Sequence, residues 1–414
     1  MNKNQTNLLN RFLKYSSIPS QSKEGAAEVP STPGQLILAK ELKKELEEMG
    51  LDNINLSSYG VLTARLKGNG DYPKIGWICH LDTADISLSE VVHPILVENY
   101  LEEEIKQKNG KRITTETNPE LKKHIGKDIL FSDGTSVLGA DDKAAISIVM
   151  EAISIIMENS LEHGDIYLAF TPDEEVGLKG AKALDLSLFP VDWAYTIDCQ
   201  EKGEVVWETF NAGKATVRIE GVSAHPMSSK GVLVNPILVT TDIISLLPEK
   251  QRPEKTEGKE GFIWVKGIKG DSSNAELSIL IRDHDKEKYE EKKRVIEEAV
   301  KVARSNNPRA KLTLEIEDTY SNLIESMNDK NRIAVDNLNT ALKINGIEEK
   351  PMAMRGGTDG SFISTKGIFV PNYFTGASNF HSTSEFWPLE DGEASLFVTL
   401  NLMTGGRYNK PFDS

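Results

Sequence analysis

Apolar residues in the first half of the chain follow two alternating patterns. Short apolar runs at 74–83, 165–170 and 193–199 are typical of buried strands. Between and before them, residues 35–49 and 141–160 carry apolar side chains at helical spacing. Strands that alternate with helices of this length predict an α/β layer with a mostly parallel central sheet.

The start of the first of these helices has a local signature. Thr32 and Gln35 are spaced as in a capping box, and Pro33 occupies the first helical position. Gly50 follows the last apolar turn and is a suitable terminator. We therefore expect a helix that begins at residue 33 with its first amides capped by Thr32.

The pattern changes near residue 211. A strand, a helix, two strands, a charged amphipathic helix and a last strand follow one another, which is the ferredoxin-like β-α-β-β-α-β order. The helix and strand alternation resumes after about residue 325. We therefore expect a small domain at 211–324 inserted into a larger domain made of 1–210 and 325–414. Residues 84–130 are polar and acidic without a clear period, and are interpreted as a long excursion over the surface.

Composition excludes several classes of protein. Of 414 residues, 39% are hydrophobic and 27% are charged, which is ordinary for a globular protein with a large core. A net charge of −15 argues against nucleic acid as a partner, because phosphate binding requires clustered Lys and Arg. No stretch approaches a membrane span or a secretory signal. Two cysteines, Cys79 and Cys199, exclude a disulfide framework and predict a cytoplasmic protein with both thiols in the core.

Histidine and acidic residues recur where apolar runs end. Each occurrence also has an ordinary explanation: a core histidine, an aspartate that caps a helix, or a solvated turn. The stretches are His80-Leu81-Asp82, Asp141-Asp142, Glu174-Glu175, Asp198, and His381 after a late strand.

Taken together, these stretches offer two histidines, two aspartates and one glutamate as ligands. This set suits zinc or a comparable divalent ion. Five such residues serve two metals only if one of them bridges, and an aspartate can supply one oxygen to each. Two metals about 3.5–4 Å apart can hold a water and a carbonyl oxygen together, and the water needs a base, which a second glutamate provides. Asp82 is placed to orient His80.

Motifs along nearly the whole chain then point to a known family. They are HLDT (80–83), residues 118–144 ending in DGTSVLGADDKA, FTPDEEVG (170–177), YTID (195–198), GVSAHP (221–226), RGGTDGS (355–361) and NFH (379–381). In this order they resemble the M20 family of zinc metallopeptidases, and within it the peptidase T subfamily of tripeptide aminopeptidases.

The resemblance implies a di-zinc exopeptidase-like catalytic domain with an inserted lid or dimerisation domain. It also implies two Zn²⁺ per subunit, with Co²⁺ or Mn²⁺ as substitutes, and a cis peptide at Asp141–Asp142. Glu174 would be the general base, and Asp82 would orient a ligand. The implied ligands are His80, Asp141 and Asp198 for one metal, and Asp141, Glu175 and His381 for the other.

Further residues acquire roles through the same resemblance. His225 would stabilise the oxyanion, in some relatives across a dimer interface; otherwise it is a surface-turn histidine. Arg355 would bind the substrate carboxylate bidentately; otherwise it forms a structural salt bridge. Asn322 and Arg282 are further candidates for substrate contact.

The implied reaction is hydrolysis of the N-terminal residue from short peptides, preferentially tripeptides, with a water between the metals activated by Glu174. A dipeptidase, carboxypeptidase or N-acyl amino acid deacylase of the same family is the alternative, and a binding protein without activity is a further one. The partners expected are a short peptide and a second subunit. The chain departs from the family pattern at five positions: Ala145, Cys199, Gln200, Met227 and Ser382.

Overall fold

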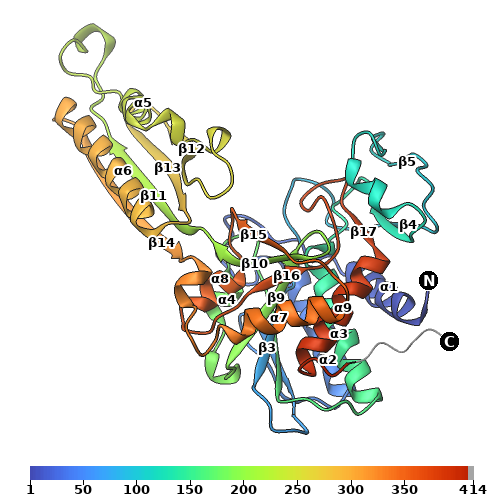
Figure 1. Ribbon diagram of the computed structural model, residues 1–414. Coiled ribbons are helices and arrows are strands. Elements are labelled where there is room, and N and C mark those ends of the chain that lie inside the picture. Colours follow the sequence, from blue (N-terminus) through green and yellow to red (C-terminus); the bar gives the residue numbers. More distant parts are fainter. Residues whose placement is uncertain (409–414) are drawn as a thin grey trace. The chain divides into compact units, whose positions relative to one another are not determined.

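The computed structural model describes residues 1–408, which divide into two units (Figure 1). Unit 1 consists of residues 1–207, 326–352 and 358 onward, and unit 2 of residues 208–325 and 353–357. The sequence placed 353–357 in the larger domain, whereas in the structure this short segment groups with unit 2.

An eight-stranded mixed sheet forms the centre of unit 1. Its middle strands β8, β3, β9 and β16 are parallel, as the sequence predicts, and antiparallel pairs lie toward both edges. Every residue of β3 and β8 is buried, so helices and loops cover both faces there. In order across the sheet the strands are β1 (Asp52–Leu56), β2 (Leu62–Leu66), β8 (Ile166–Thr171), β3 (Ile75–His80), β9 (Trp193–Cys199), β16 (Asn372–Phe374), β10 (Glu204–Thr209) and β15 (Lys350–Met354).

Helices α1, α3 and α9 of unit 1 pack against one another, with α3 also against β3 and β9. Helices α4 and α8 form a second contacting pair beside the same central strands. The helices of unit 1 are α1 (Lys3–Ser16), α2 (Pro33–Glu48), α3 (Ala140–Glu158), α4 (Lys179–Ala183), α7 (Ile333–Ile344), α8 (Asp359–Ser364) and α9 (Leu389–Met403). Unit 1 also contains the short 3-10 helices η1 (Pro119–His124) and η2 (Leu186–Leu188). Unit 2 contains η3 (Pro226–Ser228), η4 (Glu249–Gln251) and η5 (Pro253–Lys255), and η6 (Leu323–Ser326) lies at the boundary between the units in the sequence.

The start of α2 is where the sequence places it, but the expected cap is wrong. The Thr32 hydroxyl donates to the carbonyl of Gln21 at 2.7 Å and does not cap the helix. The Gln35 carboxamide instead donates to the Asp173 carboxylate at 2.8 Å and accepts from the Asp173 amide at 2.9 Å. A tertiary contact has replaced the local one, and it ties α2 to the loop that follows β8.

Residues 84–130 are more ordered than their polar sequence suggests. Strand β4 (Pro94–Val97) joins β7 (Ile129–Ser132) and β17 (Phe386–Pro388) in a three-stranded antiparallel sheet. Strands β5 (Ile105–Lys106) and β6 (Arg112–Ile113) form a small hairpin. A hydrophobic cluster lies beneath, and Phe386 from the distant C-terminal part contributes to it.

Unit 2 is a four-stranded antiparallel sheet with two helices that contact each other and the strands. The strand order is β12-β13-β11-β14, and the element order along the chain is β-α-β-β-α-β. The elements are β11 (Asn211–Glu220), α5 (Pro236–Leu246), β12 (Phe262–Gly270), β13 (Asn274–Asp283), α6 (Lys286–Asn306) and β14 (Lys311–Tyr320). Unit 2 has an apolar core of its own between sheet and helices.

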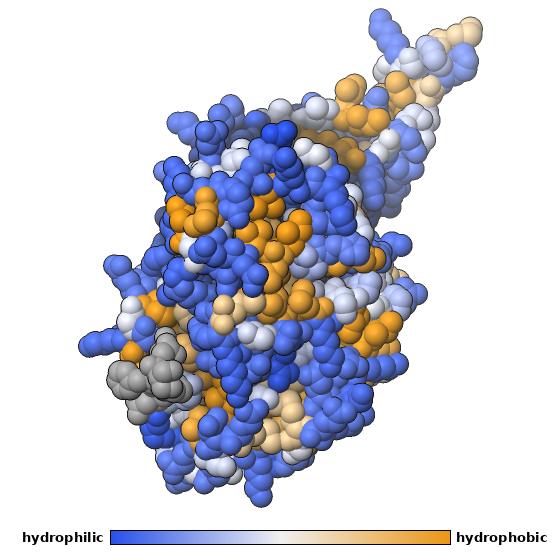
Figure 2. Space-filling model, turned by 90° about the vertical axis from the view of Figure 1, so that its right-hand side faces the viewer, coloured by the Kyte–Doolittle hydropathy of each residue, from blue (hydrophilic) through white to orange (hydrophobic). Residues whose placement is uncertain are grey.

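Hydrophilic residues predominate on the face shown in Figure 2, with apolar residues in patches between them. No helix among the described residues has the length and apolar character that crossing a membrane requires. Cys79 and Cys199 are buried and free, as the sequence predicts.

Gly76 in β3 offers a test of core packing. A Cβ at this position would lie 2.2 Å from Cζ of the buried Phe189 ring. We expect Gly76→Ala to cost roughly 1–3 kcal/mol by overpacking, and the thermal midpoint to fall by roughly 2–4 °C per kcal/mol. The matched control is Gly267→Ala in β12, where a Cβ meets no described atom within 4 Å. Equal midpoints for the two variants, measured by calorimetry, would contradict this packing.

Candidate metal centre

Acidic residues and histidines gather where the parallel strands of unit 1 end. His80 is the last residue of β3, and Asp198 lies near the end of β9. Because the carboxyl ends of parallel strands meet at one edge of the sheet, side chains distant in sequence come together there. Three overlapping groups have ligand atoms within 4.8 Å of one another: His80, Asp141, Asp142 and Asp198; His80, Glu174 and Glu175; and Asp141, Glu175 and His381.

Asp141 occupies the middle of this cluster. Its Oδ1 lies 2.8 Å from Nε2 of His80, and its Oδ2 lies 2.9 Å from Nε2 of His381. Burial alone would raise the pKa of Asp141, but hydrogen bonds from the two imidazoles outweigh burial and lower it. Each carboxylate oxygen therefore faces a different histidine, which is the arrangement that a bridging ligand requires.

The orientation of His80 is set from its other ring nitrogen. Nδ1 lies 3.0 Å from the carbonyl oxygen of Asp82 and 3.5 Å from its Oδ1. A proton on Nδ1 that is donated to this carbonyl leaves the lone pair of Nε2 directed at Asp141.

The Asp82 carboxylate has a second contact that the sequence did not suggest. It accepts the backbone amides of Glu174 at 2.9 Å and of Glu175 at 3.2 Å. Asp82 is fully buried, so these bonds are shielded from water. The same residue therefore holds the backbone of both glutamates in place beside His80.

Glu174 and Glu175 lie in a turn rather than on extended backbone, since β8 ends at Thr171. This allows both side chains to approach His80, whereas neighbours on a strand point to opposite faces. Asp173, with a positive φ of 58°, precedes the pair and is fixed by Gln35. The anchors Gln35 and Asp173 were missed by the sequence analysis, because their contact is tertiary.

Both glutamates have perturbed acidities. Burial is the main cause that raises the pKa of Glu174, and the neighbouring charges of Glu175 and Asp198 add to it. Burial and the charge of Asp141 raise the pKa of Glu175 to about 7, although His381 opposes this at an Oε1–Nε2 distance of 2.6 Å. Carboxyl groups of raised pKa are suited to accept and return protons near neutral pH.

Asp142 also belongs to the cluster, although it was not expected to be a ligand. Its Oδ2 accepts the backbone amide of His80 at 3.0 Å, and its Oδ1 is buried without a hydrogen-bond partner in the part of the chain that the structure describes. The Asp141–Asp142 peptide is cis, as expected. The sequence did contain a signal for this role of Asp142: one aspartate is enough to cap a helix, and the pair exceeds that need.

The donor set fits a pair of divalent cations. Six carboxyl groups that are buried or partly buried face only two histidines, and an excess of desolvated negative charge is costly unless cations compensate it. Carboxylate oxygen and imidazole nitrogen are ligands for zinc and similar metals. The six carboxyl groups belong to Asp82, Asp141, Asp142, Glu174, Glu175 and Asp198.

His225, expected to act on the substrate, lies in unit 2 on an exposed turn. Its Nδ1 accepts the backbone amide of Met227 at 3.2 Å and so begins the short helix η3. This leaves Nε2 as its remaining polar atom. A role in catalysis stays a prediction.

Arg355 is held by its own unit. Its guanidinium donates to the carbonyl oxygens of Gly258 and Glu260 at 3.0 and 2.9 Å, and to the hydroxyl of Thr256 at 2.8 Å. The rings of Phe210 and Phe262 each lie 5.4 Å from it. These bonds hold a loop rather than form the salt bridge considered as an alternative. A substrate carboxylate as its partner stays a prediction.

Asn322 and Arg282 also have partners within unit 2. The Asn322 side chain accepts from the amide of Thr209 at 2.8 Å and donates to the carbonyl of His284 at 3.0 Å. Arg282 donates to the carbonyl of Gly213 at 3.1 Å and lies over the ring of Tyr320. Both contacts stabilise the unit, and the substrate roles of the two residues stay predictions.

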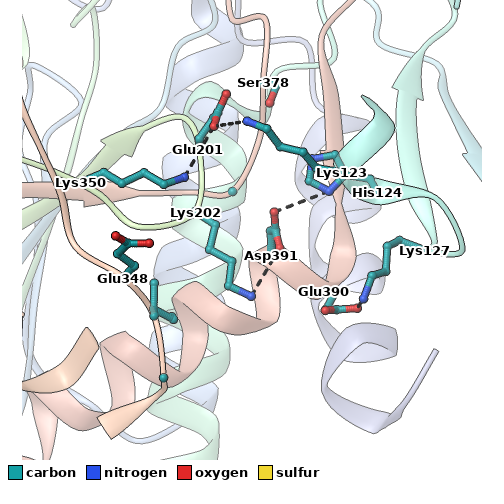
Figure 3. Close-up of a pocket in the computed structure, with 13 residues that line it drawn as sticks. Lys123, His124, Lys127, Glu201, Lys202, Glu348, Lys350, Ser378, Glu390 and Asp391 are labelled. Carbon is teal, nitrogen blue, oxygen red and sulfur yellow. Dashed lines mark hydrogen bonds and ion pairs between the residues drawn. The ribbon is translucent and has the colours of Figure 1, made fainter. Parts of the chain in front are cut away.

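A pocket of about 360 Å³ elsewhere in unit 1 is a competing location for a site (Figure 3). Lys123 and Lys350 lie 2.7 and 3.7 Å from the carboxylate of Glu201, and Lys202 lies 3.7 Å from that of Asp391. None of the expected metal ligands is among its described lining residues. Its charges compensate one another, unlike those of the metal-ligand cluster.

Comparison with known proteins identifies the family of the chain. Residues 138–404 match the family described as Peptidase family M20/M25/M40. A peptidase T-like protein of Yersinia pestis is 45% identical over 395 residues, covering 95% of this chain and 96% of the relative. Peptidase T of Escherichia fergusonii is 41% identical over 399 residues, covering 95% and 97%. The crystal structure of a tripeptidase from Staphylococcus aureus superposes with a TM-score of 0.75 at 23% identity, covering 97% of this chain and 98% of that one. The chain therefore belongs to peptidase family M20/M25/M40, as its motifs indicated.

Proposed function

We propose that this protein is a metal-dependent aminopeptidase that removes the N-terminal residue from tripeptides. The observation that carries the proposal is Asp141, whose two carboxylate oxygens face His80 and His381, with Glu174 in the adjacent turn. Relatives named peptidase T, which align over 95% of the chain, support this activity over others in the family.

Two of the three groups in the cluster support the proposed ligands. His80, Asp141 and Asp198 hold one cation, and Asp141, Glu175 and His381 hold the other. We propose zinc at both positions, with cobalt or manganese as functional substitutes. Bound there, two such cations supply an acidic water and polarise the scissile carbonyl.

Glu174 is proposed as the general base. Its raised pKa favours transfer of a proton from the attacking water and its return to the leaving amine. Asp82 holds the backbone amide of Glu174 and, through its carbonyl oxygen, the ring of His80. One residue thus fixes both the base and a metal ligand.

Selection for length is proposed to come from unit 2. Arg355 binds the peptide carboxylate, with Asn322 and Arg282 as further contacts, and His225 stabilises the oxyanion. Recognition of the C-terminal carboxylate together with removal of the first residue favours tripeptides over shorter or longer peptides. We further propose a cytoplasmic location and a homodimer formed through unit 2.

A peptide-length series tests the proposed reaction. Zinc-loaded protein is incubated with di-, tri- and tetrapeptides whose residues all differ, and the fragments are identified by mass spectrometry. We expect the free N-terminal residue from the tripeptide and little turnover of the others. Release of the C-terminal residue would identify a carboxypeptidase instead, and cleavage only of acylated amino acids would identify a deacylase.

Glu174→Gln tests the general base. The variant keeps the shape of the side chain and loses its ability to accept a proton, so kcat should fall by about 10²- to 10⁴-fold while two metals still bind. Glu48→Gln, at an exposed position of α2, is the control and should behave as the wild type. Wild-type kcat in Glu174→Gln would exclude this residue as the base.

Metal removal tests the charge argument. Without cations the clustered carboxylates repel one another, so a chelator should abolish hydrolysis and lower the thermal midpoint. Zinc at 100 times its Kd should restore about 2.7 kcal/mol of stability. A midpoint that is the same with chelator and with zinc would show that no cation binds the folded protein.

A further inference from the structure

Four consecutive backbone amides of the Asp141 turn converge on one carboxylate, that of Glu385. Its Oε2 accepts from Leu138 at 2.7 Å and from Gly139 at 2.9 Å. Its Oε1 accepts from Ala140 at 2.8 Å and from Asp141 at 3.3 Å. The Glu385 side chain is 1% exposed, so these bonds are shielded from water.

The turn cannot supply these acceptors itself. Gly139 precedes α3 with a left-handed φ of 75° and has no side chain to act as a cap. Asp141 and Asp142 have non-helical backbone angles, so the regular part of α3 begins after them. Amides at a helix start have no carbonyl of a preceding turn to bond, and a carboxylate there also complements the helix dipole.

The backbone of Glu385 is also held in place. Its carbonyl accepts the amide of Ser132 at 3.1 Å. The next residue, Phe386, begins β17, pairs with Phe131 of β7 and is fully buried. The side chain therefore extends from a rigid part of the structure toward the Asp141 turn.

The same segment carries a metal ligand. His381 lies four residues before Glu385, and its Nε2 faces Oδ2 of Asp141. The carboxylate of Glu385 thus connects the loop of one ligand to the loop of the other. Metal ligands need placement to within about 0.5 Å, so a shift of either loop would disturb the shared position.

We infer that Glu385 is a positioning residue of the metal centre, because it fixes the backbone of residues 138–141 and hence the two oxygens of Asp141 relative to His381. The inference rests on the proposed function for its kinetic consequence, whereas its effect on metal binding is independent of the substrate. Glu385 bonds the backbone amides of residues 138–141 and not the carboxylate oxygens of Asp141, and it acts through Asp141.

The test is Glu385→Gln in the full chain. The variant keeps the size of the side chain, but one carboxylate oxygen becomes an NH₂ group. This group is a donor and would face two backbone amides that are also donors, so their hydrogen bonds are lost. We expect cobalt to bind about 10- to 100-fold more weakly at one of the two positions, with a changed visible absorption spectrum. With zinc, kcat should fall and KM should stay near the wild-type value.

Glu393→Gln is the matched control. Glu393 is also a buried carboxylate of the C-terminal segment that accepts several hydrogen bonds, from Asn2, Asn4 and Gln5, but it has no contact with the cluster. This variant should lose thermal stability while its cobalt spectrum and kcat stay unchanged. The pair separates loss of stability from loss of positioning.

A Glu385→Gln variant that loses only thermal stability, as the control does, would overturn the inference. If Glu385→Gln fails to fold, Glu385→Asp is measured in the same way, because it keeps the charge but has a shorter side chain. Wild-type cobalt affinity and a wild-type spectrum in Glu385→Asp would also overturn the inference. Wild-type protein that binds two cobalt ions but hydrolyses no peptide would refute the proposed function and leave the metal-binding test of Glu385 intact.

Discussion

One shared carboxylate imposes its geometry on the surrounding parts of unit 1. Asp141 must present one oxygen to a histidine at the end of β3 and the other to a histidine 240 residues later in the chain. The turns that contain Asp141 and Glu174 are each held by a buried carboxylate from elsewhere in the chain. The site is thus a set of loops whose mutual positions are enforced by charged hydrogen bonds.

These bonds also explain how so much negative charge tolerates burial. Asp82, Asp173 and Glu385 are each neutralised in part by backbone amides, two or more in the cases of Asp82 and Glu385. Charged acceptors of this kind form stronger hydrogen bonds than neutral ones. The proposed ligand carboxylates of Asp141, Glu175 and Asp198 lack such donors in comparable number, and they are the ones available to cations.

Much of the fold and of the site was predictable from the sequence, for a physical reason. Strand β9 was predicted with its observed limits, and each expected ligand follows an apolar run, so burial and strand direction place the ligands together. Contacts between distant loops leave no periodic signal. Glu385, the Gln35–Asp173 pair and the participation of Phe386 in the 84–130 region were missed for that reason, and the local cap at Thr32 was predicted wrongly.

The return of residues 353–357 to unit 2 has a consequence for any exchange of parts between relatives. The polypeptide crosses between the units four times. Arg355 lies in the short segment of unit 2, residues 353–357, whereas its aromatic and carbonyl partners lie in the long segment, residues 208–325. Transplanting 208–325 alone would separate that arginine from its own cage of Phe210 and Phe262. Unit 2 is therefore built from two separate stretches of chain, and a recombination breakpoint between them would give Arg355 the partners of a different relative.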